Sequence, residues 1–295
     1  MAMSASDTAT RLELCLLAGL LGDAWGGAYE GQSAPLEPAF PRIAVVSDDT
    51  QLVMATCEAL IETGGRAEPE SIAGRFREWF TSGRLTGLGS STLKALRDLS
   101  AGAHWALSGA RGEFAAGAGA AMRAAPLAFF LDPSVDHDRQ LIRDVSRITH
   151  HSDEAYAGAL AMVLAVRSCA TSTGVSEDLP KIVAADLPDT AVRDRLLRLC
   201  GLSIEAAAQL GASGHVVDAV PLALRIASVP GLSCTNAVRA AISCGGDTDT
   251  IAAMAAQVLG ASGTPIPDEL VDRVQDAAQA RALFSQTAAL IGRAG

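Results

Sequence analysis

The chain has 295 residues, of which 49% are hydrophobic and 19% charged, and its formal net charge is −10. This acidic balance argues against a nucleic-acid-binding protein, because such proteins need a basic face to neutralise phosphates. An anionic small substrate stays compatible with it if bound metal ions supply local positive charge. The apolar content is ample for a core and is rich in alanine, the best helix former, so we predict an all-α fold.

Cysteine usage and hydropathy limit the cellular context. The six cysteines form no C-x-x-C pair, and we expect buried reduced thiols without disulfides or a zinc site. The N-terminus lacks a basic region followed by an apolar core, so no signal peptide is predicted. The longest strongly apolar stretch, residues 155–166, is shorter than the roughly 20 residues that span a bilayer. We therefore expect a cytoplasmic monomer that does not contact membranes.

The predicted elements are helices throughout. We expect disorder over residues 1–9 and a loop with three prolines over residues 32–46. Apolar spacing and end signals predict helices over residues 10–21, 47–62, 69–81, 93–99, 134–148, 153–170, 190–202, 204–210 and 216–227, with further ones starting near 121 and 247 and one or two over 267–291. No period-two run predicts a strand, and no linker or repeat divides the chain. We expect a single domain over residues 1–295.

Two acidic segments stand apart, S-D-D-T at residues 47–50 and D-T-D-T at residues 247–250, each directly before a predicted helix. Either segment alone is compatible with an ordinary helix N-cap. A cap needs one such residue, however, and adjacent carboxylates repel each other unless a cation lies between them. Hard oxygen ligands of this type suit Mg2+, Mn2+ or Ca2+. Two such segments brought together would hold two metal ions.

A third acidic region follows the first predicted helix, in the glycine-rich residues 22–30. Asp23 there is typical of a turn cap, and Glu30 by itself is typical of a surface acid. Arg123 is compatible with a phosphate contact or with a local structural pair. Trp25 either lines a site or packs in the core.

Five segments together resemble the ADP-ribosylglycohydrolase family, which includes dinitrogenase-reductase-activating glycohydrolase and the ADP-ribosylarginine and ADP-ribosylserine hydrolases. In chain order they are LLGDAWGGAYE, SDDT, GAGAAMRAAPL, ITHHSDEAYAGA and SCGGDTDTIAAMA. They span most of the chain. The combination of S-D-D-T with a downstream G-D-T-D-T is specific, whereas either half alone would be weak.

The resemblance implies a compact orthogonal helical bundle with a dinuclear Mg2+ or Mn2+ site in a central cleft. It implies that Glu30, Asp48 and Asp249 take part in catalysis, and that Gly117, Gly119, Arg123 and His150 bind substrate, with the glycine loop along the diphosphate. The metal ligands that it implies are Ser47, Asp48, Asp49, Asp247, Asp249 and Thr250.

The implied reaction is hydrolysis of the glycosidic bond between ADP-ribose and an acceptor, on a modified protein or a small conjugate. Such a bond breaks through an oxocarbenium-like transition state. Metal ions can bind vicinal ribose hydroxyls and lower the pKa of a bound water. Glycine-loop N–H groups can bind phosphate oxygens without a basic side chain, which suits an acidic protein.

The chain departs from the family pattern at two positions. Ala118 stands where members often carry an asparagine in the glycine loop, so an amide that could bond substrate is missing. Gly87 stands where many members carry an acid, which in arginine-directed members is thought to lie near the guanidinium. This second departure argues against ADP-ribosylarginine as the substrate and leaves the acceptor open.

Three alternatives remain at this stage. The first is a catalytically inactive ADP-ribose-binding or structural member of the same fold. The second is a hydrolase of free conjugates such as O-acetyl-ADP-ribose, which would use the same site. The third is a prenyl-diphosphate synthase, whose D-D-x-x-D motif needs a third acid that the residues after Asp48 and Asp49 do not supply.

Overall fold

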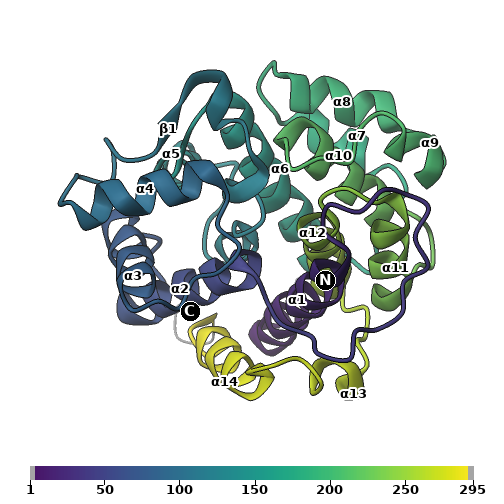
Figure 1. Cartoon of the computed structure of the whole chain (residues 1–295), viewed down its shortest axis with the longest axis horizontal. Coiled ribbons are helices and arrows are strands. Elements are labelled where there is room, and N and C mark those ends of the chain that lie inside the picture. Colours follow the sequence, from purple (N-terminus) through teal and green to yellow (C-terminus); the bar gives the residue numbers. More distant parts are fainter. Residues whose placement is uncertain (1–3, 292–295) are drawn as a thin grey trace.

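The computed structural model describes residues 4–291, the Phe114 side chain excepted, and the regular secondary structure over this range is almost all helical (Figure 1). The predicted all-α class is therefore confirmed. The helices are α1 Ala5–Gly26, α2 Asp48–Glu62, α3 Pro69–Thr81, α4 Ser90–Ser100, α5 Asp136–Arg147, α6 Asp153–Ala170, α7 Leu179–Ala185, α8 Ala191–Leu199, α9 Ile204–Ala208, α10 Val216–Ala227, α11 Cys234–Cys244, α12 Thr248–Ala261, α13 Asp268–Val271 and α14 Ala277–Ala288.

Four of the longer helices lie where they were predicted. The bounds of α2, α3, α6 and α10 agree with prediction to within one residue. The predicted disorder over residues 1–9 is wrong from Ala5 onward; residues 1–3 lie outside the described part. The reason is a capping box, in which Ser4 accepts a hydrogen bond from the Asp7 N–H and the Asp7 carboxylate accepts one from the Ser4 N–H.

Several short elements were not predicted. Two two-residue strands, β1 Ala110–Arg111 and β2 His150–His151, pair in parallel, although no strand was expected. They are too short to show a period-two pattern. The prediction of a helix starting near Ala121 was also wrong, because a 3-10 helix over Ala125–Phe129 occupies part of that region. Pro126 explains this, since proline disfavours the helical conformation of the residue before it.

Helices α1 and α12 pack more extensively than any other pair and approach very closely (Figure 1). A Cβ atom on Gly22 would lie 2.6 Å from the Ala252 carbonyl oxygen, and one on Gly26 would lie 2.5 Å from the Thr248 carbonyl oxygen. Only glycine permits backbones to meet this closely. The Thr248 hydroxyl donates to the Gly26 carbonyl at 2.8 Å and so secures the N-terminal end of α12 against α1.

Helix α2 is joined to α1 through a buried carboxylate. Asp23 is fully buried and accepts hydrogen bonds from the Ser47 N–H at 3.0 Å, from the Ser47 hydroxyl at 2.8 Å and from the Thr50 N–H at 3.0 Å. It therefore caps the N-terminus of α2 from another helix, in addition to the local cap that Ser47 provides. This contact orients the first turn of α2 toward the ends of α1 and α12.

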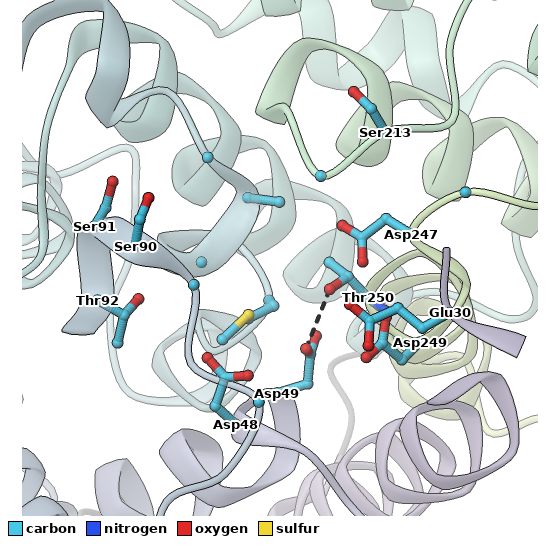
Figure 2. Close-up of a pocket in the computed structure, with 18 of the residues that line it drawn as sticks. Glu30, Asp48, Asp49, Ser90, Ser91, Thr92, Ser213, Asp247, Asp249 and Thr250 are labelled. Carbon is cyan, nitrogen blue, oxygen red and sulfur yellow. Dashed lines mark hydrogen bonds between the residues drawn. The ribbon is translucent and has the colours of Figure 1, made fainter. Parts of the chain in front are cut away.

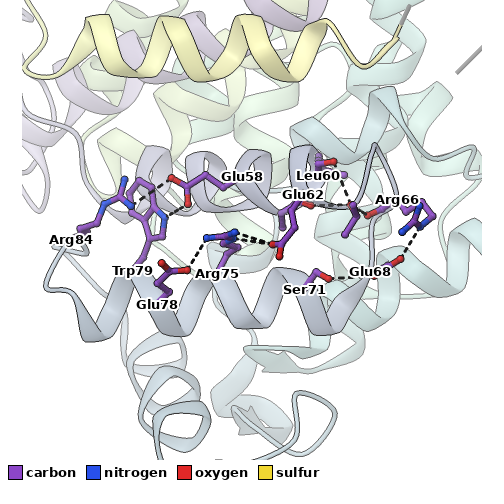
Figure 3. A network of polar contacts seen from close by, with 12 residues as sticks. Glu58, Leu60, Glu62, Arg66, Glu68, Ser71, Arg75, Glu78, Trp79 and Arg84 are labelled. Atoms are coloured by element: carbon purple, nitrogen blue, oxygen red, sulfur yellow. Dashed lines mark hydrogen bonds and ion pairs between the residues drawn. The ribbon is translucent and has the colours of Figure 1, made fainter. Parts of the chain in front are cut away.

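Polar contacts join α2 and α3 along their outer faces (Figure 3). Glu58 accepts a 2.7 Å hydrogen bond from the Trp79 indole, and the Arg84 guanidinium stacks on the same indole ring. Arg75 bridges Glu62 and Glu78. These pairs are partly exposed, so each adds little stability, and the buried apolar face of α2 carries most of its packing energy.

All six cysteines are free. Cys15, Cys57, Cys169 and Cys234 are buried as expected, whereas Cys200 is exposed. Within residues 4–291, no helix combines the length and apolar character that crossing a bilayer requires.

Candidate active site

Acidic side chains from both ends of the sequence face one cavity of about 470 Å³ (Figure 2). Asp48 and Asp49 come from the first turn of α2. Asp249 comes from the first turn of α12, and Asp247 is the N-cap residue directly before that helix. Glu30 joins them directly after the 3-10 helix Gly27–Tyr29. The two segments singled out in the sequence are therefore brought together.

A direct hydrogen bond links the two acidic segments. The Thr250 hydroxyl donates to Asp49 Oδ2 at 3.1 Å, across 201 residues of sequence (Figure 2). Both residues are buried. The contact holds the first turns of α2 and α12 at hydrogen-bonding distance.

The cluster carries more negative charge than a buried site tolerates by itself. Burial and the neighbouring Asp23 raise the pKa of Asp48 to about 8, and burial and Asp249 raise the pKa of Asp247 to about 8. Burial, with Asp249 next, also raises the pKa of Asp49 well above its usual range. For the more exposed Glu30, the charge of Asp249 is the main cause of a raised pKa. A cation in the cavity would relieve this repulsion.

The donor set fits hard divalent cations. Oxygen atoms of Glu30, Asp247 and Asp249 lie within 4.8 Å of one another. Asp49 Oδ1 is buried and lacks a hydrogen-bond partner among the described residues, which leaves it available as a ligand. No lysine or arginine of the described part lines the cavity. Clustered carboxylates without a basic partner are the environment in which Mg2+ and Mn2+ bind.

The hydroxyls of two residues of the predicted ligand set, Ser47 and Thr250, donate hydrogen bonds to aspartates. Ser47 does not line the cavity, and its hydroxyl donates to Asp23. Thr250 lines the cavity, but its hydroxyl donates to Asp49. The structure thus gathers Asp48, Asp49, Asp247 and Asp249 around the cavity and places these two hydroxyls in hydrogen bonds that hold the aspartates.

The opposite wall is the glycine loop and a buried histidine. Gly117, Ala118, Gly119 and His150 all line the cavity. A Cβ on Gly119 would lie 2.8 Å from Cε1 of His150, so glycine there lets the loop lie against the imidazole ring. Burial is the main reason that the pKa of His150 falls to about 3, and the ring is neutral at physiological pH.

Arg123, which was predicted to bind substrate, lies behind this wall and does not line the cavity. It is 2% exposed, and its guanidinium donates to the Gly119 carbonyl at 2.6 Å, the Val145 carbonyl at 3.2 Å and the Thr149 hydroxyl at 2.8 Å. Its position matches the structural alternative. Trp25 is also buried in the core and does not line the cavity.

Sequence reasoning missed several residues that build the site. Asp23 was interpreted as a local turn cap, and its cap on a distant helix has no sequence signal. The loop Ser213–Gly214 lines the cavity, and a Cβ on Gly214 would lie 2.9 Å from Asp247 Oδ2. Hydroxyl residues at the start of α4 also line it, namely Ser90, Ser91 and Thr92. Serine and threonine at a helix start are a signal that the sequence does carry for these residues.

Comparison with known proteins identifies the family of the chain. The family model described as ADP-ribosylglycohydrolase matches residues 4–294. The chain is 28% identical over 235 residues to an uncharacterized protein of Archaeoglobus fulgidus, covering 78% of this chain and 75% of that one. It is 29% identical over 254 residues to the uncharacterized protein YegU of Escherichia coli, covering 74% and 71%.

Two further matches carry a descriptive name. The ADP-ribosylhydrolase ARH3 of Danio rerio is 27% identical over 311 residues, which cover 85% of this chain and 82% of that one. A solved structure named as an ADP-ribosylglycohydrolase-related protein complex superimposes with a TM-score of 0.76 at 23% identity, covering 97% of this chain and 99% of that one. The second match establishes the fold.

Proposed function

Because the chain belongs to the ADP-ribosylglycohydrolase family, we propose that it is a metal-dependent hydrolase that cleaves the glycosidic bond between ADP-ribose and an acceptor. The substrate would be an ADP-ribosylated protein or a small molecule that contains ADP-ribose. The observation that carries the proposal is the meeting of Asp48 and Asp49 with Asp247, Asp249 and Glu30 around a single cavity (Figure 2).

Asp48, Asp49, Asp247 and Asp249 are the residues that would hold two Mg2+ or Mn2+ ions. Bound there, such ions orient ribose hydroxyls and make a bound water more acidic. The aspartates themselves stay fixed by the Asp23 cap on α2 and by the Thr250 hydroxyl. This support matters because ligand groups must be held rigidly to act together.

Glu30 is assigned the proton transfer at the scissile bond. Its carboxylate is exposed to the cavity and has a raised pKa, chiefly through Asp249. Water adds its oxygen to the anomeric carbon of ribose, the bond from that carbon to the acceptor breaks, and Glu30 accepts the proton that the water loses. Glu30 then passes this proton to the departing acceptor, so that one water is divided between ribose and acceptor and the carboxylate of Glu30 is regenerated.

The wall of Gly117, Gly119 and His150 is assigned to the diphosphate of ADP-ribose. Backbone N–H groups and a neutral imidazole bind phosphate oxygens by hydrogen bonds, without a cationic side chain. This assignment agrees with the absence of lysine and arginine from the cavity among the described residues.

The acceptor side favours a group other than guanidinium. A Cβ on Gly87 would lie 3.3 Å from Asp48 Oδ1, so an acid at this position would reach the site. Gly87 supplies none, so the additional carboxylate that arginine-directed members carry at this position to pair with a guanidinium is missing here. We therefore propose a hydroxyl-linked protein conjugate or a free ADP-ribose ester as the preferred substrate.

Turnover of a substrate panel tests the proposal. ADP-ribosylated arginine, ADP-ribosylated serine, poly-ADP-ribose and O-acetyl-ADP-ribose would be incubated with the protein in Mg2+ and in EDTA. We expect Mg2+-dependent release of ADP-ribose from an oxygen-linked substrate, loss of it in Asp247→Ala, and no change in Asp136→Ala, which alters an exposed aspartate. Turnover that persists in EDTA would contradict metal dependence. Tight ADP-ribose binding without turnover of any of the four would identify a binding protein of the same fold.

A further inference from the structure

Buried polar groups form a continuous chain from Arg123 to His150. The Arg123 Nη2 donates to the Thr149 hydroxyl at 2.8 Å, and that hydroxyl lies 2.7 Å from His150 Nδ1. Thr149 is 0% exposed, Arg123 2% and His150 3%. These hydrogen-bonded groups contact Nδ1 of the imidazole ring, and the cavity lies on the other side of the ring.

The donor and the acceptor of each hydrogen bond follow from the chemistry of the Arg123 guanidinium. Burial lowers the pKa of Arg123 to about 9, and the guanidinium remains charged at neutral pH. A guanidinium only donates, so the Thr149 oxygen accepts from it. The Thr149 proton then needs its own acceptor, and His150 Nδ1 is the group that the described residues offer it. A buried hydroxyl proton without an acceptor would cost about 1–3 kcal/mol.

This direction decides which ring nitrogen of His150 carries the proton. If Nδ1 accepts from Thr149, the neutral ring has its proton on Nε2. Nε2 faces the glycine loop: a Cβ on Gly117 or on Gly119 would lie 3.3 Å from it. The N–H therefore points into the part of the cavity that the loop lines.

We propose that Arg123 and Thr149 are positioning residues that fix His150 as the Nε2–H tautomer, which donates a hydrogen bond to a phosphoryl oxygen of the bound nucleotide diphosphate. The ligand in this statement rests on the proposed function, whereas the tautomer does not. Arg123 also donates to the Gly119 carbonyl at 2.6 Å, so one guanidinium holds both the loop and the ring. The opposite tautomer would present a lone pair to an anionic oxygen and repel it.

The tautomer is measured by two-bond 1H–15N NMR of the histidine side chains in the full-length protein, with the His150 signals assigned from their loss in His150→Gln. We expect a protonated-type Nε2 shift and an unprotonated-type Nδ1 shift that persist between pH 6 and 8. Thr149→Ser keeps this pattern because it keeps the hydroxyl. Thr149→Val gives averaged shifts of a mixed population. A protonated Nδ1 in the unaltered protein would overturn the proposal.

Binding of ADP-ribose in Mg2+, measured by calorimetry, tests the consequence. We expect Thr149→Val to weaken binding about tenfold, Thr149→Ser to stay within about twofold, and Thr56→Val to have no effect. Thr56 is the matched control, since it is buried and its hydroxyl bonds only within α2, to the Leu52 carbonyl. Unchanged affinity in Thr149→Val would overturn the role. If His150 is the Nε2–H tautomer but the protein turns over no substrate, the proposed function is contradicted and the positioning role is not.

Discussion

The hydroxyl of Thr248 donates to the carbonyl of Gly26 at 2.8 Å, and this bond joins the beginning of α12 to the end of α1. Glu30 follows Gly26 within a short turn, and Asp247 and Asp249 flank Thr248. The contact between α1 and α12 therefore also places Glu30 beside Asp247 and Asp249, whose carboxylate oxygens lie within 4.8 Å of one another.

Gly26→Ala should damage both stability and the site. Its Cβ would lie 2.5 Å from the Thr248 carbonyl oxygen, where the backbone must move, and we expect the free energy of unfolding to fall by about 1–3 kcal/mol. Urea unfolding and Mg2+ titration measure the two effects. Gly27→Ala is the matched control, since a Cβ there meets nothing within 4 Å. Equal stability of the two variants would show that the close approach is not required.

Thr250→Val should weaken metal binding while the chain stays folded. The change removes the hydroxyl that donates to Asp49 Oδ2, and the charged carboxylate then loses its fixed orientation. A hydrogen bond to a charged group contributes about 1.5–3 kcal/mol, so we expect Mg2+ affinity to fall roughly ten- to hundredfold. Calorimetry on Thr250→Val and Thr250→Ser measures this. The serine variant should retain most of the affinity. If both variants bind Mg2+ as tightly as the unaltered protein, the Thr250 hydroxyl does not support the metal site.

Mg2+ affinity should rise as pH increases from 6 to 8.5. Burial, together with nearby carboxylates, raises the pKa of Asp48 and of Asp247 to about 8, so in this window the metal-free folded protein holds protons that the unfolded chain has already released. Folding then binds protons, and the stability of the metal-free protein falls as pH rises toward about 8. A bound cation displaces those protons and removes the loss.

Calorimetry in buffers of different ionisation enthalpy measures the protons that Mg2+ displaces, and thermal unfolding in EDTA and in Mg2+ measures stability. We expect proton release at pH 6 that disappears by pH 9, and unfolding temperatures that diverge with increasing pH. An affinity that does not vary with pH would mean that the aspartates are ionised before the cation binds.

Glu30→Gln should lower turnover far more than substrate affinity. The amide keeps the shape of the side chain but cannot accept the proton that the attacking water loses. General acid–base groups typically contribute about 10²–10⁴ in rate, and we expect a loss of this size in kcat. Steady-state kinetics and ADP-ribose calorimetry separate the two quantities. Glu37→Gln, an exposed glutamate of the following loop, should behave as the unaltered protein. Unchanged kcat in Glu30→Gln would assign the proton transfer to another group.

Local features of the chain could be predicted from the sequence alone. Apolar spacing located α2, α3, α6 and α10 almost to the residue, with Ser and Asp marking the starts of α2 and α6 and Pro69 the start of α3, because caps and periodicity act over a single turn. The excess of carboxylates at residues 47–50 and 247–250 marked the site by composition. The same local rules failed where an element was only two residues long, as in β1 and β2.

The tertiary structure decided which of these residues meet and what each one does. Asp23 caps α2 and accepts a hydrogen bond from the Ser47 hydroxyl. Arg123 lies behind His150 and donates to the Thr149 hydroxyl. No sequence pattern reports such contacts, because they depend on how closely whole helices approach. That approach is set by the absence of a side chain at Gly22 and Gly26, which lets α1 and α12 touch. Because Asp23 of α1 also caps α2, Asp49 comes within a hydrogen bond of Thr250.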